Sequence, residues 1–148
     1  MRKQVSKSSL LLPAMLAMAC VSAAYAEDED VITYRQLIMK QLDAGSAALG
    51  MMVSGQIPPD SLGQQTRALA ANAKMALKSF EPKVSGGEAK SEVWTKWVDF
   101  SMRMEQFVKK ADEMAKAGDA GNVSQVTELM VDALPCKQCH DVYRMKKK

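Results

Sequence analysis

Residues 91–117, SEVWTKWVDFSMRMEQFVKKADEMAKA, show most clearly how the chain folds. Apolar side chains recur there every three or four residues, at Val93, Trp97, Phe100, Met104, Phe107 and Val108. This spacing places them on one face of an α-helix and leaves the charged residues on the other face. The stretch therefore predicts an amphipathic helix that buries one face against other helices.

Three further segments of the same character surround this stretch. Ala, Met, Leu, Lys, Glu and Gln are abundant, and Val and Ile form no alternating runs, which favours helices over strands. Gly, Pro and capping residues delimit segments at about 31–54, 59–80, 91–117 and from 122 to the C-terminal lysines. Four helices with short connections predict an all-α fold, an antiparallel four-helix bundle.

A proline interrupts the fourth segment. The segment offers an apolar face made of Val123, Val126, Leu129, Met130, Ala133 and Leu134. Pro135 follows directly and has no N–H to donate to the carbonyl of Val131. We therefore expect a kink, or a fresh helical start, at Pro135.

The first 26 residues have the form of a cleaved secretory signal peptide. A basic start (Arg2, Lys3 and Lys7) precedes a short apolar core, and Ala24-Tyr25-Ala26 matches a signal-peptidase site. The apolar core is too short to span a membrane, and no other stretch is long enough. We expect cleavage after Ala26, leaving a periplasmic domain at 27–148 that is not integral to the membrane.

The leader contains an alternative processing site. Ala17-Met18-Ala19-Cys20 resembles a lipoprotein box, which would leave a lipidated Cys20 at the start of the mature chain. Such boxes usually have Leu where Ala17 stands, so the site after Ala26 is preferred.

Charge and histidine content exclude several classes of function. The leader holds three of the 20 basic residues and none of the 17 acidic ones, so the mature chain would carry equal numbers. That balance removes the main support for nucleic-acid binding. With one histidine, His140, the chain cannot build a histidine-based triad elsewhere or a multi-histidine metal site. No nucleophile–base pair can be proposed, so an enzyme is not expected.

The reactive residues are gathered in Cys136-Lys137-Gln138-Cys139-His140. Cys-x-x-Cys-His is the attachment signature of c-type haem. Residues i, i+3 and i+4 of a helix share a face. Cys136 and Cys139 can therefore form thioethers with the two haem vinyl groups while His140 donates a ring nitrogen to the iron. The motif predicts one covalently bound haem c.

Other interpretations of the motif fit less well. A structural zinc site needs four ligands, and the mature chain offers three. A thioredoxin-like dithiol needs a strand-to-helix context, and a disulfide between Cys136 and Cys139 would close a very short loop. The motif could also be incidental in a bundle without haem.

Three stretches resemble the class II c-type cytochromes, which are cytochrome c′ and its low-spin relatives. They are YRQLIMK at 34–40, VWTKWVDF at 93–100 and CKQCHDVYR at 136–144. The resemblance covers nearly the whole mature chain. It implies an antiparallel four-helix bundle, one covalent haem, export in soluble form and a role in electron transfer.

The sixth iron ligand is expected to be a methionine. Antiparallel first and last helices would bring Met39 to about the level of His140, and Met75 also passes this test. The resemblance favours Met39, because low-spin members of the family take their ligand there. Met39 could instead be core packing beside a five-coordinate iron.

Three more residues are candidate haem contacts. Arg35 lies one turn before Met39, and Arg144 lies one turn after His140, so either could pair with a haem propionate. Trp94 is a candidate haem neighbour, although an aromatic stripe at helical spacing usually forms core.

The leading functional prediction is a periplasmic monohaem one-electron carrier with iron ligated by His140 and Met39. Its partners would be periplasmic redox proteins or membrane electron-transfer complexes, and the resemblance allows a homodimer. The alternative is a five-coordinate, cytochrome c′-like haem protein that binds NO or CO.

Overall fold

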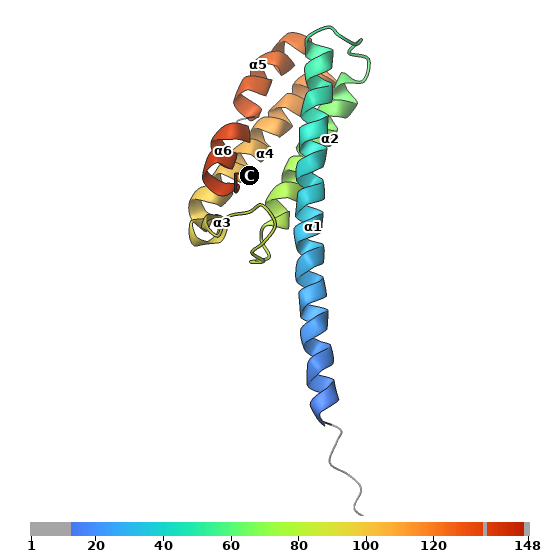
Figure 1. Ribbon diagram of the computed structural model, residues 1–148. Coiled ribbons are helices and arrows are strands. Elements are labelled where there is room, and N and C mark those ends of the chain that lie inside the picture. The colour runs from blue at the N-terminus through green and yellow to red at the C-terminus, as the bar shows by residue number, and fades with distance from the viewer. Residues whose placement is uncertain (1–12, 135, 147–148) are drawn as a thin grey trace, which may run out of the picture.

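The structure, a computed structural model, describes residues 13–134 and 136–146, and for residues 13–26 it describes the backbone alone. The helices are α1 (Pro13–Val53), α2 (Leu62–Ser79), α3 (Glu92–Thr95), α4 (Trp97–Asp119), α5 (Val123–Ala133) and α6 (Cys136–Tyr143). Helices α1, α2, α4 and the α5–α6 pair alternate in direction as four long segments (Figure 1). The predicted all-α, antiparallel bundle is confirmed.

Helix α1 begins earlier than the sequence predicts. The expected start was near Val31, but the helix starts at Pro13 and continues without interruption past Ala26. Proline suits a first helical turn, where its missing N–H has no partner to lose, and the Ala- and Met-rich residues after it favour helix. The early part of α1 projects beyond the other helices (Figure 1). The basic start of the leader, at Arg2, Lys3 and Lys7, lies outside the described residues.

The third predicted helix is divided in two. Helix α3 ends at Thr95 and α4 begins at Trp97, with Lys96 between them at φ −117° and ψ 39°. The indole Nε1 of Trp94 donates a hydrogen bond to the carbonyl of Phe80 at 3.1 Å. The break at Lys96 therefore separates the single turn of α3, which is hydrogen-bonded to the end of α2, from the long helix α4.

The predicted interruption of the last helix is confirmed. Helix α5 ends at Ala133 and α6 begins at Cys136, while Pro135 itself lies outside the described residues. Leu134 leaves the helical conformation at φ −113° and ψ 53°. The motif therefore lies on a separate helix of eight residues, whose direction is not set by α5.

The core contains the apolar positions expected from the periodicity. Buried members of the predicted set are Val93, Phe100, Met104, Val126 and Ala133. The half-buried members pack around them; they are Trp97, Phe107, Val108, Val123, Leu129, Met130 and Leu134.

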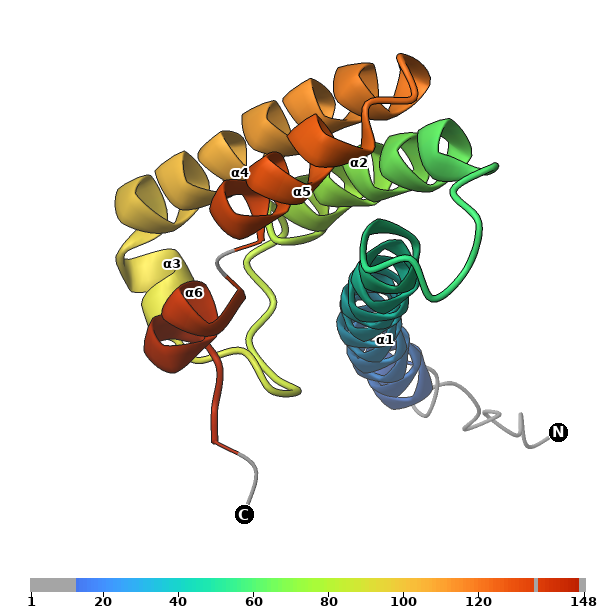
Figure 2. The ribbon, with the colours of Figure 1, turned by 90° about the horizontal axis from the view of Figure 1, so that it is seen from above.

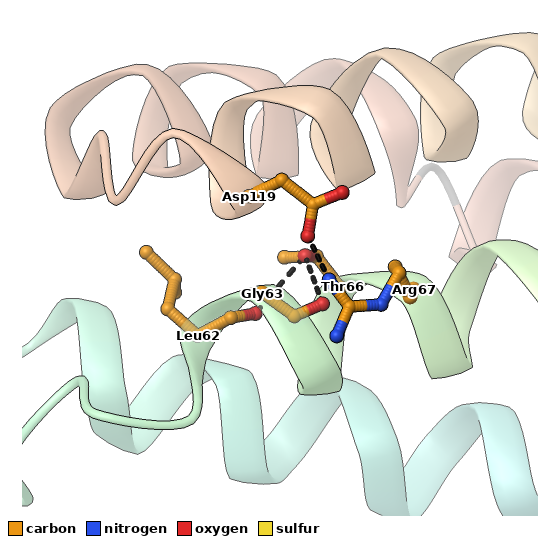
Figure 3. Close-up of polar contacts among 5 residues, drawn as sticks. All are labelled: Leu62, Gly63, Thr66, Arg67 and Asp119. Atoms are coloured by element: carbon orange, nitrogen blue, oxygen red, sulfur yellow. Dashed lines mark hydrogen bonds and ion pairs between the residues drawn. The ribbon is translucent and has the colours of Figure 1, made fainter.

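Helix α2 packs most extensively against α4. Thr66 is fully buried there, and its hydroxyl donates to two carbonyls of the preceding turn at 3.0 and 3.1 Å (Figure 3). A Cβ on Gly118 would overlap the Thr66 side chain, so a glycine is required at this crossing. Arg67 and Asp119 form an ion pair beside it (Figure 3).

Of the helices in the described residues, none is long and apolar enough to cross a membrane.

Candidate haem site

Helix α6 presents the motif within little more than one helical turn. Cys136 is exposed, while Cys139 and His140 are half-buried, and Cys139 packs against the main core. Both cysteines carry free thiols, the form from which thioether bonds are made. Burial lowers the pKa of His140, so the neutral imidazole that binds iron is favoured.

A loop at 86–90 holds the C-terminal end of α6. The N–H of Lys90 donates to the carbonyl of Tyr143 at 2.9 Å, and its ammonium donates to two further carbonyls of the last turn at 3.1 and 3.3 Å. The N–H of Met145 donates to the carbonyl of Glu88 at 2.8 Å. A cation at the exposed carbonyls of a helix C-terminus is favourable. These bonds fix the position at which the motif helix ends.

The same loop contacts α1. Gly87, at φ 60°, lies so close to α1 that a Cβ there would come within 2.9 Å of Ile32 and 2.8 Å of Gln36. Seen from above, α1 lies on one side and α3 with α6 on the other, with the connection between α2 and α3 running between them (Figure 2). The loop therefore links the two walls, α1 and α6, between which the sequence predicts the haem.

Arg35 is a buried cation on the α1 wall. It is 4% exposed, and its guanidinium lies over the ring of Phe80, 4.5 Å from the ring centroid. Its Nε donates to the carbonyl of Ser79 at 3.3 Å, and its Nη1 donates to the carbonyl of Val84 at 3.1 Å. Its Nη2 is buried without a hydrogen-bond partner. Burial lowers the pKa of Arg35, because removal from water disfavours its charged form.

Trp94 lies beside Arg35. The guanidinium carbon of Arg35 is 5.2 Å from the centroid of the Trp94 ring. The ring centroids of Trp94 and Phe80 are 6.5 Å apart. Trp94 is half-buried and packs against the main core. The structure thus brings two of the predicted haem contacts, Arg35 and Trp94, into one cluster.

Met39 lies one turn after Arg35 on α1. It is half-buried and packs against the same core cluster as Cys139 and Trp94. Asp43 lies one turn further along α1, and its charge is close enough to α6 to act on His140. Burial and the charge of Arg144 lower the pKa of His140, while the charges of Glu88 and Asp43 partly oppose that shift. This part of α1 therefore faces the motif. Met75, the other methionine at this level, is 37% exposed.

Arg144 lies directly after α6, beside the loop at 86–90. Its Nε is 3.8 Å from a carboxylate oxygen of Glu88, and its charge contributes to lowering the pKa of His140. The side chain is exposed. Arg144 is thus near His140, as expected, but the structure pairs it with a carboxylate of the loop and does not bring it to Arg35.

The sequence interpretation missed a polar group at the base of α6. The hydroxyl of Tyr143 donates to Oδ2 of Asp99, and Nε of Arg103 donates to the same oxygen at 2.8 Å. Asp99 and Arg103 are four residues apart, which is the spacing of an ion pair on a helix. This spacing is the only sign of the polar group that the sequence offers. Their contact with Tyr143 joins residues 44 positions apart and has no local signature.

The residues present fit a covalent haem. The motif on α6 offers two thiols and a neutral imidazole, while Met39 on α1 and Trp94 on α3 offer apolar side chains that pack against the same core. The unpartnered Nη2 of Arg35 is a donor suited to a haem propionate, because a buried guanidinium is stabilised by a carboxylate.

Comparison with known proteins agrees with this fit. The family model described as Cytochrome C′ matches residues 30–144. The chain belongs to the cytochrome c′ family. Cytochrome c′ from Alcaligenes xylosoxydans xylosoxydans is 28% identical over 126 residues, which cover 83% of this chain and 99% of the relative. Cytochrome c′ from Halomonas halodenitrificans is 31% identical over 130 residues, covering 80% of this chain and 98% of the relative.

Solved structures of the family share the fold. Ferric cytochrome c prime from Alcaligenes xylosoxidans matches with a TM-score of 0.75 at 27% identity, covering 81% of this chain and 97% of that one. A nitric oxide complex of a variant of the same protein also matches with a TM-score of 0.75, at 27% identity, covering 80% and 97%. The predicted class II c-type cytochrome family is confirmed, and with it the covalently bound haem c that cytochrome c′ carries.

Membership in the cytochrome c′ family changes the balance between the two functional predictions. The leading prediction was an electron carrier with His140 and Met39 on the iron. The relatives are cytochromes c′, and one is solved with nitric oxide bound. They therefore favour the alternative, a cytochrome c′-like haem protein, over the six-coordinate carrier.

Proposed function

We propose that this member of the cytochrome c′ family would hold its haem between α1 and α6 and bind a diatomic gas, NO or CO, at the iron. Cys136 and Cys139 would form the thioether bonds, and His140 would be the protein ligand to iron. The haem, when bound, supplies an iron that changes oxidation state and takes gas ligands. The observation that carries the proposal is the family match over 30–144, together with the nitric oxide complex of a relative.

Arg35 would anchor the haem by a propionate. Its Nη2 is buried and unpartnered, and its other two bonds, to the carbonyls of Ser79 and Val84, hold the guanidinium in place. A carboxylate would satisfy the remaining donor and offset the buried charge. Trp94, 5.2 Å from that guanidinium, would line the same edge of the haem. Arg144, already paired with Glu88, would be the weaker contact.

Met39 would control the access of gas to the haem. It lies on α1, one turn after Arg35, and is half-buried against the core. A flexible thioether side chain can fill that space without blocking it permanently. Access of a gas to the iron would then depend on how readily Met39 moves aside.

A second candidate function is one-electron transfer with Met39 as the sixth ligand. The same position of Met39 favours it, since sulfur is a suitable ligand for haem iron and a His/Met pair raises the potential. Its partners would be periplasmic redox proteins or membrane electron-transfer complexes.

Spectroscopy of the exported holoprotein distinguishes the two functions. A high-spin ferric spectrum and ready carbon monoxide binding to the reduced protein are expected. In Met39→Ala carbon monoxide should bind faster, because the space beside the iron opens, while Met39→Leu, which keeps the volume, should remain closer to wild type. A low-spin wild-type spectrum that becomes high-spin in both variants would support the electron carrier and contradict the gas-binding proposal.

Export and assembly complete the proposal. Cleavage after Ala26 would release a periplasmic domain at 27–148 that binds gas or exchanges electrons without turning over a substrate. A homodimer is supported by apolar side chains that α1 exposes, Tyr34 at 49%, Leu37 at 50% and Met51 at 42%. Sedimentation of the holoprotein would measure its mass in solution, and a monomer at all concentrations would contradict the dimer.

A further inference from the structure

The C-terminal end of α6 is hydrogen-bonded to α4 through one carboxylate oxygen of Asp99. Tyr143 is 3% exposed, and its hydroxyl donates to Oδ2 of Asp99 in the first turn of α4. Arg103, one turn further along α4, donates to that oxygen from its Nε at 2.8 Å. Asp99 therefore receives two hydrogen bonds at a single atom, one from its own helix and one from the motif helix.

Both partners are held in the state that the contact needs. The hydrogen bonds from Arg103 and Tyr143 lower the pKa of Asp99, so its carboxylate stays ionised. Burial, with the bond to Asp99, raises the pKa of Tyr143 to about 12, so its hydroxyl stays a donor. The ring of Tyr143 also packs edge-on against Phe100, with centroids 5.1 Å apart and planes at 80°. The hydroxyl thus has a fixed direction.

This group lies directly beside the haem motif. Tyr143 is three residues after His140, so the two side chains lie on neighbouring turns of one helical face. Arg103 and Asp99 lie close enough to Cys139 for their charges to act on it. A helix of eight residues gains little stability on its own and takes its orientation from tertiary contacts. The bond to Asp99 is one of the contacts that set how α6 is rotated.

We propose that Asp99 is a positioning residue for the haem: through the Tyr143 hydroxyl it fixes the rotation of α6, and so the direction from which His140 reaches the iron. Arg103 holds the Asp99 carboxylate for this role. The inference rests on the proposed attachment at Cys136, Cys139 and His140. It predicts that a change at Asp99, which touches neither haem nor gas, alters the bond between His140 and iron.

Matched variants of the holoprotein test the role. Tyr143→Phe keeps the ring and removes the hydroxyl, and Asp99→Asn removes the charge that Arg103 holds. The control is Asp119→Asn, which breaks another Asp–Arg pair of α4 with Arg67 (Figure 3). Asp119 is twenty residues along the helix from Asp99, about 30 Å away at 1.5 Å per residue.

The readouts are the resonance Raman frequency of the iron–histidine bond, the reduction potential and carbon monoxide affinity. Tyr143→Phe and Asp99→Asn should each shift the frequency and the potential, and change the affinity by up to about tenfold. Their effects should not add, because they break one contact. Asp119→Asn should leave all three readouts unchanged even where it lowers stability.

The outcomes separate this inference from the proposed function. Wild-type signatures in Tyr143→Phe, which preserves packing and should fold, would overturn the positioning role whether or not Asp99→Asn matures. Wild-type protein exported without covalent haem would overturn the proposed function itself. Equal shifts in all three variants would show a general loosening of the bundle and would also overturn the positioning role.

Discussion

At the scale of single residues, Arg35 connects three parts of the chain. Its guanidinium bonds the carbonyl of Ser79 at the end of α2 and that of Val84 in the loop, and it covers the ring of Phe80. An apolar neighbourhood makes these bonds costly to lose, because the carbonyls are left without donors. One side chain thus supports the fold while one of its donors, Nη2, stays without a partner.

Arg35→Gln should lower the free energy of unfolding by about 1–3 kcal/mol, since the shorter amide cannot serve both carbonyls. Urea unfolding of the holoprotein, followed by circular dichroism, measures this. The control is Arg67→Gln, which removes an exposed pair with Asp119 and should cost less than about 1 kcal/mol. If both variants lost the same free energy of unfolding, the buried contacts of Arg35 would stabilise the fold no more than an exposed ion pair does, which would contradict the prediction.

The Tyr143 hydroxyl should make stability depend on alkaline pH. The folded pKa is raised from 10.0 to about 12, by burial first and then by the bond to Asp99. Between these values the unfolded chain loses the phenol proton and the folded chain keeps it. The contribution of this group is therefore complete below about pH 10 and is lost as pH rises to about 12.

Unfolding free energies of wild type and Tyr143→Phe across this pH range measure the effect. The difference between the two proteins should shrink steadily from pH 10 to pH 12. A constant difference over the range would contradict the raised pKa, whatever its size.

At the scale of helices, α2 and α4 meet at a glycine. Gly118→Ala should lower the free energy of unfolding by about 1–3 kcal/mol, because the new methyl overlaps the fully buried Thr66. Gly50→Ala is the control, as a Cβ at Gly50 meets nothing within 4 Å and alanine favours helix. It should be neutral or stabilising by up to about 1 kcal/mol. Thermal unfolding of both variants measures this, and a loss in Gly50→Ala as large as in Gly118→Ala would contradict it.

The sequence predicts these helices to different degrees. Apolar periodicity and glycine or proline breaks identify α2, α4 and the division before α6, because local chemistry controls each of them. The division at Lys96 has no glycine or proline, and it is tied to Trp94 bonding the distant carbonyl of Phe80. The early start of α1 follows from a leader whose composition also suits a helix.

The site was predictable where its chemistry is local. The spacing of Cys136, Cys139 and His140 is a pattern within five residues, and it can be recognised in one dimension. The partners of Arg35 are carbonyls of a turn and a loop, which no side-chain pattern specifies. The bond between Tyr143 and Asp99 depends on how α6 is rotated against α4, which emerges only when the bundle is packed.

At the scale of the whole molecule, the chain should lose the projecting part of α1 on export. We expect the exported protein to begin at Glu27, since Ala24-Tyr25-Ala26 provides the cleavage site. Intact mass and N-terminal sequencing of periplasmic material measure this. Replacing Ala24 and Ala26 together by Leu should retain the leader. A mature chain that starts at a lipidated Cys20 would contradict the prediction.

A row of aromatic rings crosses the molecule from α1 to α6. The Arg35 guanidinium lies over Phe80, Phe80 packs against Phe100 with centroids 4.9 Å apart, and Phe100 packs against Tyr143 at 5.1 Å. Closely packed rings resist compression, so we expect this row to keep α1 and α6 at a set separation. We therefore expect that the two faces of the haem cannot be tuned independently by mutation, and that a residue which shortens the row would retune both at once.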